Sequence, residues 1–113
     1  MTQDPWPWPD ALDAVIAAPG HHSLVLENER VRVLDTHIPV GDTVPLHTHR
    51  WPAVYYVIQA SHFIRRDQDG KITFDSRTVP PRGTANFFEC LPPHSVENVG
   101  DLEIHLISVE LKP

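Results

Sequence analysis

The most informative stretch of this chain is Gly41-Asp42-Thr43-Val44-Pro45-Leu46-His47-Thr48-His49. It begins with turn residues, continues as a short strand pattern and ends in two histidines separated by one residue. Because side chains on a β-strand alternate between faces, His47 and His49 emerge on the same face, about 7 Å apart at their Cα atoms. Two imidazoles placed in this way are able to share one metal ion.

A second histidine element lies downstream, between residues 83 and 98, and ends in an H-x3-N pattern before the last apolar run. Together the two stretches resemble the two motifs of the cupin superfamily, G-x5-H-x-H-x3,4-E-x6-G and G-x5-P-x-G-x2-H-x3-N. The resemblance covers roughly residues 31–111 and implies a small antiparallel β-barrel, or jelly roll. For activity it is less specific, because this scaffold carries oxygenases, isomerases, sugar-binding modules and storage proteins.

In the first motif, Gly41, His47 and His49 fall in register with the family pattern. Ala53 stands where the family has a metal-binding glutamate, and Ala60 stands where it has the closing glycine. The glutamate ligand is therefore missing.

In the second motif, Gly83, His94 and Asn98 fall in register. Glu89 occupies the proline position and Leu91 the inner glycine position. The second motif thus keeps its histidine and its asparagine but not its turn residues.

The resemblance implies that His47, His49 and His94 bind one divalent transition metal per chain. Fe(II) is favoured, and Zn, Ni, Mn and Cu also suit imidazole ligands. Three protein ligands leave a coordination position open, as catalytic sites do. With no glutamate ligand the charge of the ion is uncompensated, so the site should prefer an anionic ligand. Two alternatives stay open: the histidines are hydrogen-bonded core residues or remnants of a decayed site, or Glu89 supplies a carboxylate.

Four further residues are candidates for the chemistry. Tyr55 follows the vacant position by two residues, and His62 is expected near the barrel mouth; either is a candidate catalytic group. Arg50 and Trp51 directly follow the second histidine, and together with Tyr55 they are candidates to contact a substrate carboxylate. Alternatively, Arg50 and Trp51 close the barrel end by stacking, and Tyr55 packs in the core.

The chain is expected to be an all-β, single-domain barrel over residues 21–113, preceded by a Trp-Pro arm and a short helix over residues 1–20. The helix should bury an apolar face at positions 12, 15 and 16. We expect His21 and His22, just before the first strand, to lie in solvent. The predicted strands are 23–27, 31–38, 44–49, 53–59, 62–66, 71–75, 85–91, 95–98 and 102–111.

The register of the strand 53–59 places Tyr55, Val57 and Gln59 inward. Its outward set, at positions 54, 56 and 58, is apolar as well, so both faces of the strand should be covered. This pattern and the tryptophan-containing arm predict a homodimer.

At 113 residues the chain has room for one domain. Nine basic against fifteen acidic residues give a net charge of −6, and no basic cluster exceeds Arg65-Arg66, so a nucleic-acid partner is not expected. The single cysteine, the lack of a signal-peptide pattern and the lack of a long apolar run favour a soluble, cytoplasmic protein with no membrane partner.

These features predict a metal-binding cupin, foremost a metal-dependent oxygenase or dioxygenase acting on a small anionic or chelating organic molecule. At the level of its site it is similar to cysteine dioxygenase and acetylacetone dioxygenase, which have three-histidine iron sites. Two other functions stay open. One is a non-catalytic small-molecule binding or sensor protein, and the other is a metal-assisted isomerase or lyase with His62 or Tyr55 as base.

Overall fold

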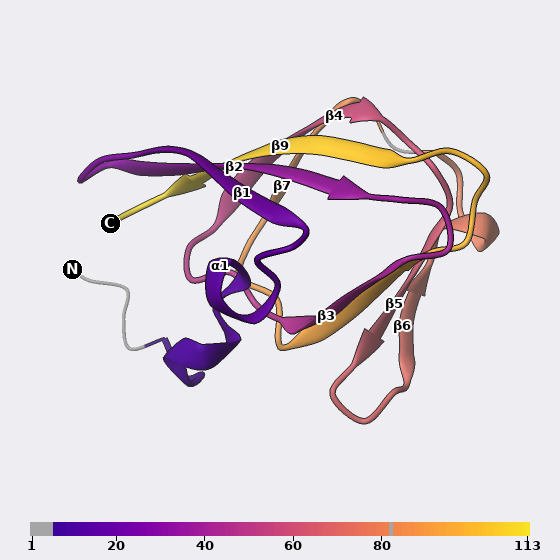
Figure 1. Cartoon of the computed structure of the whole chain (residues 1–113), viewed down its shortest axis with the longest axis horizontal. Coiled ribbons are helices and arrows are strands. Elements are labelled where there is room, and N and C mark those ends of the chain that lie inside the picture. Colours follow the sequence, from indigo (N-terminus) through magenta and orange to yellow (C-terminus); the bar gives the residue numbers. More distant parts are fainter. Residues whose placement is uncertain (1–5, 82) are drawn as a thin grey trace.

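A computed structural model describes residues 6–81 and 83–113 and shows two antiparallel sheets facing each other (Figure 1). A 3-10 turn, η1 (Asp10–Leu12), and a short helix, α1 (Ala14–Ala17), precede the strands. The strands are β1 (His22–Glu27), β2 (Val31–Ile38), β3 (Thr43–His47), β4 (Ala53–Gln59), β5 (Phe63–Asp67), β6 (Ile72–Asp75), β7 (Ala85–Phe88), β8 (His94–Asn98) and β9 (Ile104–Leu111). A second 3-10 turn, η2 (Ser76–Thr78), lies between β6 and β7.

The strand order is β1-β2-β9-β4-β7 in one sheet and β3-β8-β5-β6 in the other. Figure 1 shows β2, β9 and β4 along one side of the molecule and β3, β5 and β6 along the other. Strands distant in sequence pair, β2 with β9 and β3 with β8, so the two histidine motifs come together. The all-β jelly-roll prediction is confirmed, and each predicted strand is present with ends shifted by up to three residues.

Strand β4 shows how far the alternation holds. Tyr55 and Val57 line the interior, whereas Val54 and Tyr56 are exposed, as the period of two predicts. The expectation that Gln59 points inward is wrong. The pairing of β4 with β9 shifts between Val57 and Gln59, and the Gln59 amide donates to a backbone carbonyl on the exposed side.

The N-terminal helix differs from its prediction in length and in buried face. It is split by Asp13, which has extended backbone dihedrals, and the buried residue of α1 is Ala14, whereas Ile16 is 58% exposed. The reason is a close main-chain approach to Thr48, the residue that follows β3. The Thr48 N–H donates to the Leu12 carbonyl at 2.7 Å, and the Ala14 N–H donates to the Thr48 carbonyl at 2.9 Å. Only a small side chain fits where two backbones are this close.

Asn98, from the H-x3-N pattern, has a structural role. Its side-chain amide donates to the carbonyls of Ile38 and Leu102, and its side-chain oxygen accepts from the Gly100 N–H and the Ser61 hydroxyl. A Cβ added at Gly100 would collide with Ser61. These contacts fix the turn that leads into β9.

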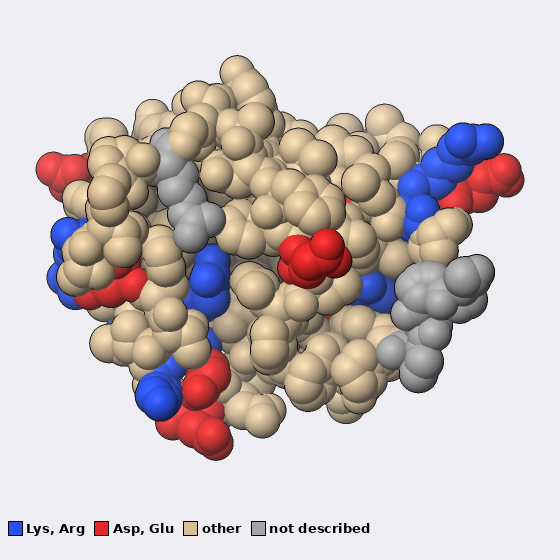
Figure 2. Space-filling model, turned by 180° about the vertical axis from the view of Figure 1, so that it is seen from behind, with Lys and Arg blue, Asp and Glu red and all other residues tan. Residues whose placement is uncertain are grey.

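Charged side chains are spread over the surface. On the face shown in Figure 2, Lys and Arg lie next to acidic side chains, mostly at the periphery, and uncharged side chains cover most of the centre. Among the described residues, no helix is long and apolar enough to cross a membrane.

Candidate metal centre

Four buried histidines meet between the two sheets. His22 begins β1, His47 ends β3, His49 follows it by two residues, and His94 begins β8. The His47 ring is central, with centroid distances of 4.9 Å to His22, 5.2 Å to His49 and 4.6 Å to His94. Candidate ligand atoms of His22, His47 and His49 all lie within 4.8 Å of one another. The tightest group therefore includes a residue from β1 in addition to the H-x-H pair.

The same ring nitrogen is engaged in every member of this cluster. In three of the histidines, Nδ1 lies within hydrogen-bond distance of a backbone carbonyl: His22 with Ala18 (3.1 Å), His47 with Pro45 (2.8 Å) and His94 with Pro92 (2.8 Å). In His49, Nδ1 lies 2.7 Å from a carboxylate oxygen of Glu110. Carbonyl and carboxylate oxygens only accept, so each Nδ1 must carry the proton. A neutral ring then has a bare Nε2 lone pair, which is the state that binds a metal.

Burial keeps three of these rings, those of His22, His47 and His94, neutral. Burial, together with a smaller contribution from the neighbouring histidines, lowers the pKa of His22 and of His94 to about 4 and the pKa of His47 to about 2. Imidazole must be neutral to bind a metal ion, so three of the four rings are ready to bind at neutral pH. The donor set therefore fits a divalent transition metal.

The lowered pKa values predict a pH-dependent stability. Above the unfolded-state pKa of about 6.5 these rings are neutral in both states. As the pH falls from 6.5 to 4, the unfolded chain binds protons that buried His22, His47 and His94 do not, so the free energy of unfolding of metal-free protein should fall, with each unit of pKa difference contributing about 1.4 kcal/mol. Urea unfolding at several pH values measures this. The free energy of unfolding of His47→Gln should fall less steeply with decreasing pH than that of wild type; equal slopes in the two proteins would contradict the assignment.

The histidines open into a cavity of about 720 Å³ with a largely apolar wall. Tyr55 lines it, with its ring edge-on to His49 at a centroid distance of 6.2 Å. Burial raises the pKa of Tyr55, and the charge of Glu110 adds to this, so the phenol stays protonated and is a donor instead of a base. His62 is an exposed part of the wall, as expected for the mouth, and its Nδ1 lies 3.1 Å from the Ser76 hydroxyl.

Arg50 and Trp51 are not among the described residues of the cavity wall. Arg50 pairs with Asp10 at 2.9 Å and lies over the ring of Trp6 at 4.7 Å. The Trp51 ring has cations at 5.0 Å, from Arg32 and Lys112. This placement gives no support to the expected substrate contact, and the contacts of both side chains are with neighbouring aromatic or charged side chains.

The expectation for His22 needs correction, and that for Glu89 finds no support. His22 is 6% exposed, so its placement in solvent is wrong. It pairs with Thr36 across β1 and β2, and this register turns it inward. No local signal marks His22, because the strand that it begins does not alternate between buried and exposed residues. Glu89 is exposed and lies outside the described cavity wall, which gives no support to a carboxylate ligand from that residue.

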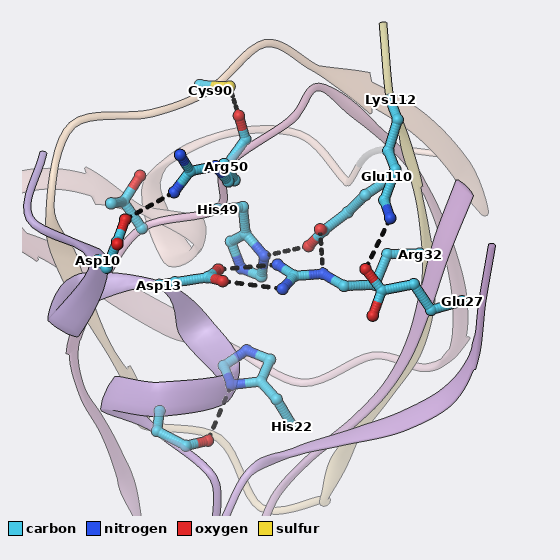
Figure 3. Close-up of polar contacts among 12 residues, drawn as sticks. Asp10, Asp13, His22, Glu27, Arg32, His49, Arg50, Cys90, Glu110 and Lys112 are labelled. Atoms are coloured by element: carbon cyan, nitrogen blue, oxygen red, sulfur yellow. Dashed lines mark hydrogen bonds and ion pairs between the residues drawn. The ribbon is translucent and has the colours of Figure 1, made fainter. Parts of the chain in front are cut away.

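A buried ionic network contacts the histidine cluster through His49 (Figure 3). Glu110 on β9 accepts from His49 and, through its other oxygen, from the Arg32 Nε at 2.7 Å. The two terminal nitrogens of Arg32 donate to the two carboxylate oxygens of Asp13, each at 2.8 Å. Sequence reasoning missed this network, because Arg32 and Glu110 are 78 residues apart and lie in strands that read as ordinary alternating strands.

No family sequence model matches the chain, and no curated protein matches it by sequence. Solved structures do resemble it. A cupin domain from Bordetella pertussis has a TM-score of 0.66 at 23% identity, covering 81% of this chain and 92% of that chain. A cupin family protein with a double-stranded β-helix fold from Methanocaldococcus jannaschii has a TM-score of 0.58 at 13% identity, covering 80% and 78%.

A third structure, described as a predicted oxalate decarboxylase from Thermotoga maritima, has a TM-score of 0.52 at 23% identity and covers 81% of this chain and 79% of that chain. At such identities the likeness concerns the fold and leaves the activity open. Strand order, the paired histidine motifs and these structures agree, and the chain therefore has the cupin fold, a double-stranded β-helix.

Proposed function

We propose that this chain is a metal-dependent oxygenase acting on a small anionic or chelating organic molecule. In this proposal His47, His49 and His94 hold one divalent transition ion, Fe(II) in the first place, and His22 is close enough to join them. The observation that carries the proposal is that Nδ1 of each of the four clustered histidines lies within hydrogen-bond distance of an accepting oxygen, so that Nε2 is the nitrogen left to bind an ion.

When bound, such an ion supplies Lewis acidity toward the oxygen atoms of a substrate and, as iron, the capacity to react with dioxygen. The apolar cavity wall excludes water from a small organic molecule beside the histidines. Arg65, which sequence reasoning did not single out as a site residue, also lines the cavity, with its guanidinium 5.3 Å from the Phe74 ring. Its positive charge suits a substrate carboxylate, and Tyr55 offers a phenol proton from the opposite sheet.

Two alternatives remain, each with its own support. A binding or sensor protein needs only the cavity and the ion. An isomerase or lyase needs a base, and because Tyr55 is held protonated, that role falls to His62 at the rim.

Turnover separates the three functions. Protein loaded anaerobically with Fe(II) is mixed with β-diketonates, α-keto acids and thiol carboxylates, and dissolved oxygen and products are followed. We expect oxygen uptake with at least one compound, strongly reduced in His47→Ala and retained in the surface variant His105→Ala. Binding without any conversion would favour the sensor, and conversion without oxygen uptake would favour the isomerase or lyase.

The homodimer and the cytoplasmic location stay predictions. Support for a dimer comes from the outer face of the five-stranded sheet, where Val54, Tyr56 and Phe87 are exposed on neighbouring strands. An apolar sheet face of this kind is typical of a covered surface.

A further inference from the structure

We infer that Glu110 is a positioning residue for His49, and that it supplies from β9 the negative charge that the family pattern places at position 53. The inference rests on the proposed metal centre, because Glu110 would act on a bound ion through His49. It is carried by the register of two strands, by the burial of an ionic network and by the contact between His49 and a carboxylate, where the other three clustered histidines contact backbone carbonyls.

The register places the two positions side by side. Ala53 on β4 is the direct cross-strand partner of Glu110 on β9. Both point inward, since Ala53 is 1% exposed and Glu110 is 0% exposed. Directly opposite residues have Cβ atoms only about 5 Å apart, so the methyl group of Ala53 leaves the space that a longer side chain on β9 can use. The carboxylate thus lies on β9, one strand away from the position on β4 where the family pattern has it. From β9 it contacts a histidine ring.

The charges of the network do not cancel. Asp13 and Glu110 contribute two carboxylates, and Arg32 contributes one guanidinium. The network therefore has a net charge of −1 beside the histidine cluster when all three groups are ionised. The Arg32 Nε lies 2.7 Å from a Glu110 oxygen, and both side chains are buried, so solvent screens the charges of this network little. The expectation that the ion's charge meets no compensating anion is consequently revised, because a carboxylate lies one imidazole ring away.

His49 differs from its neighbours through this contact. The other three histidines face neutral carbonyl oxygens, whereas the His49 Nδ1–H faces an anionic oxygen at 2.7 Å (Figure 3). A carboxylate behind an imidazole fixes the tautomer and the ring orientation and makes the outer nitrogen a stronger donor. Among the four rings, His49 should therefore form the strongest bond to an ion.

The test is Glu110→Gln, which keeps the size and a hydrogen-bond acceptor but removes the charge. We expect the affinity for Co(II) and Zn(II), measured by competition with a chromophoric chelator, to fall by about 10- to 100-fold, the range found for hydrogen-bond partners of ligating histidines. The matched control is Glu97→Gln, which removes a carboxylate from another Arg–Glu pair, that with Arg66 at 2.8 Å, and should leave the affinity unchanged. Glu110→Asp keeps the charge and should recover part of the lost affinity.

A second measurement needs no metal, and its decisive part needs only wild-type protein. Nitrogen-correlated NMR of the imidazoles in metal-free wild-type protein should show His49 as the Nδ1–H tautomer with a proton shifted strongly downfield, as expected for a bond to a carboxylate. In Glu110→Gln this signal should move while those of His47 and His94 stay in place. A His49 ring protonated on Nε2 would overturn the inference even if the variant fails to fold.

The outcomes separate this inference from the proposed function. If wild-type protein binds neither Co(II) nor Zn(II), the metal centre is wrong and the inference falls with it. If wild type and Glu110→Gln bind with equal affinity, the metal centre stands and only the role of Glu110 is overturned.

Discussion

Replacing His47 by alanine is expected to lower the affinity for a divalent transition ion by more than about 100-fold, beyond the effect of removing a hydrogen-bond partner behind a ligand. The His47 ring is in contact with the rings of the three other clustered histidines, so its loss removes a ligand from the centre of any coordination that they share. Metal content after purification and the dissociation constant for Co(II) both measure the effect.

The control variant comes from the outer face of the five-stranded sheet. Asp35, His37 and His105 form the other described group whose ligand atoms are close enough to hold an ion. His105 lies 2.7 Å from an Asp35 oxygen and is stacked on His37. His105→Ala should keep the tightly bound ion. If His105→Ala loses it and His47→Ala retains it, the ion sits on the outer face and the interior site has been misassigned.

His22→Ala and His94→Ala then define the remaining ligands. The compact group includes His22, whereas the family pattern includes His94. A loss of affinity in both variants would indicate four histidine ligands. A loss in only one would show which residue completes the site with His47 and His49.

Placing a glutamate at Ala53 is expected to destabilise metal-free protein by about 3–5 kcal/mol, the cost typical of an uncompensated buried charge. The position is 1% exposed and lies directly across from buried Glu110, whose charge is already paired with Arg32. A second carboxylate there meets a like charge and has no described cation of its own. Urea unfolding of chelator-treated protein measures the loss.

The double variant Ala53→Glu, Glu110→Ala moves the carboxylate back to the strand where the family pattern has it. Its loss of stability should be smaller than the sum of the losses in the two single variants, because the two carboxylates no longer meet and the new glutamate fills the space that the Glu110 side chain leaves. A bound ion should also stabilise the single variant Ala53→Glu more than it stabilises wild type, since the added carboxylate becomes a ligand. The affinity of Ala53→Glu for an anionic substrate should be weaker than that of wild type. Additive effects of the two substitutions would contradict a direct contact between these positions.

Much of the fold could be predicted from local pattern. The alternation of β2 and β4, the hairpin at residues 67–70 with Gly70 at a φ of +82°, and the spacing of His47 and His49 follow from backbone geometry within a few residues. Contacts between segments distant in the sequence account for the failures. A bulge after Val57 reverses Gln59, and a close main-chain approach to Thr48 selects Ala14 for burial in place of the larger apolar residues.

For the site, the H-x-H pair, the partner motif with His94 and the absence of a glutamate at position 53 can all be read from the amino-acid sequence. That His22 joins these residues and that Glu110 faces His49 became visible in the folded structure. Both depend on pairings between strands far apart in the chain, β1 with β2 and β9 with β4, whose register is selected by the packing of the whole barrel. A single residue of register shift would turn Glu110 to the outer face, and no local sequence signal specifies that register.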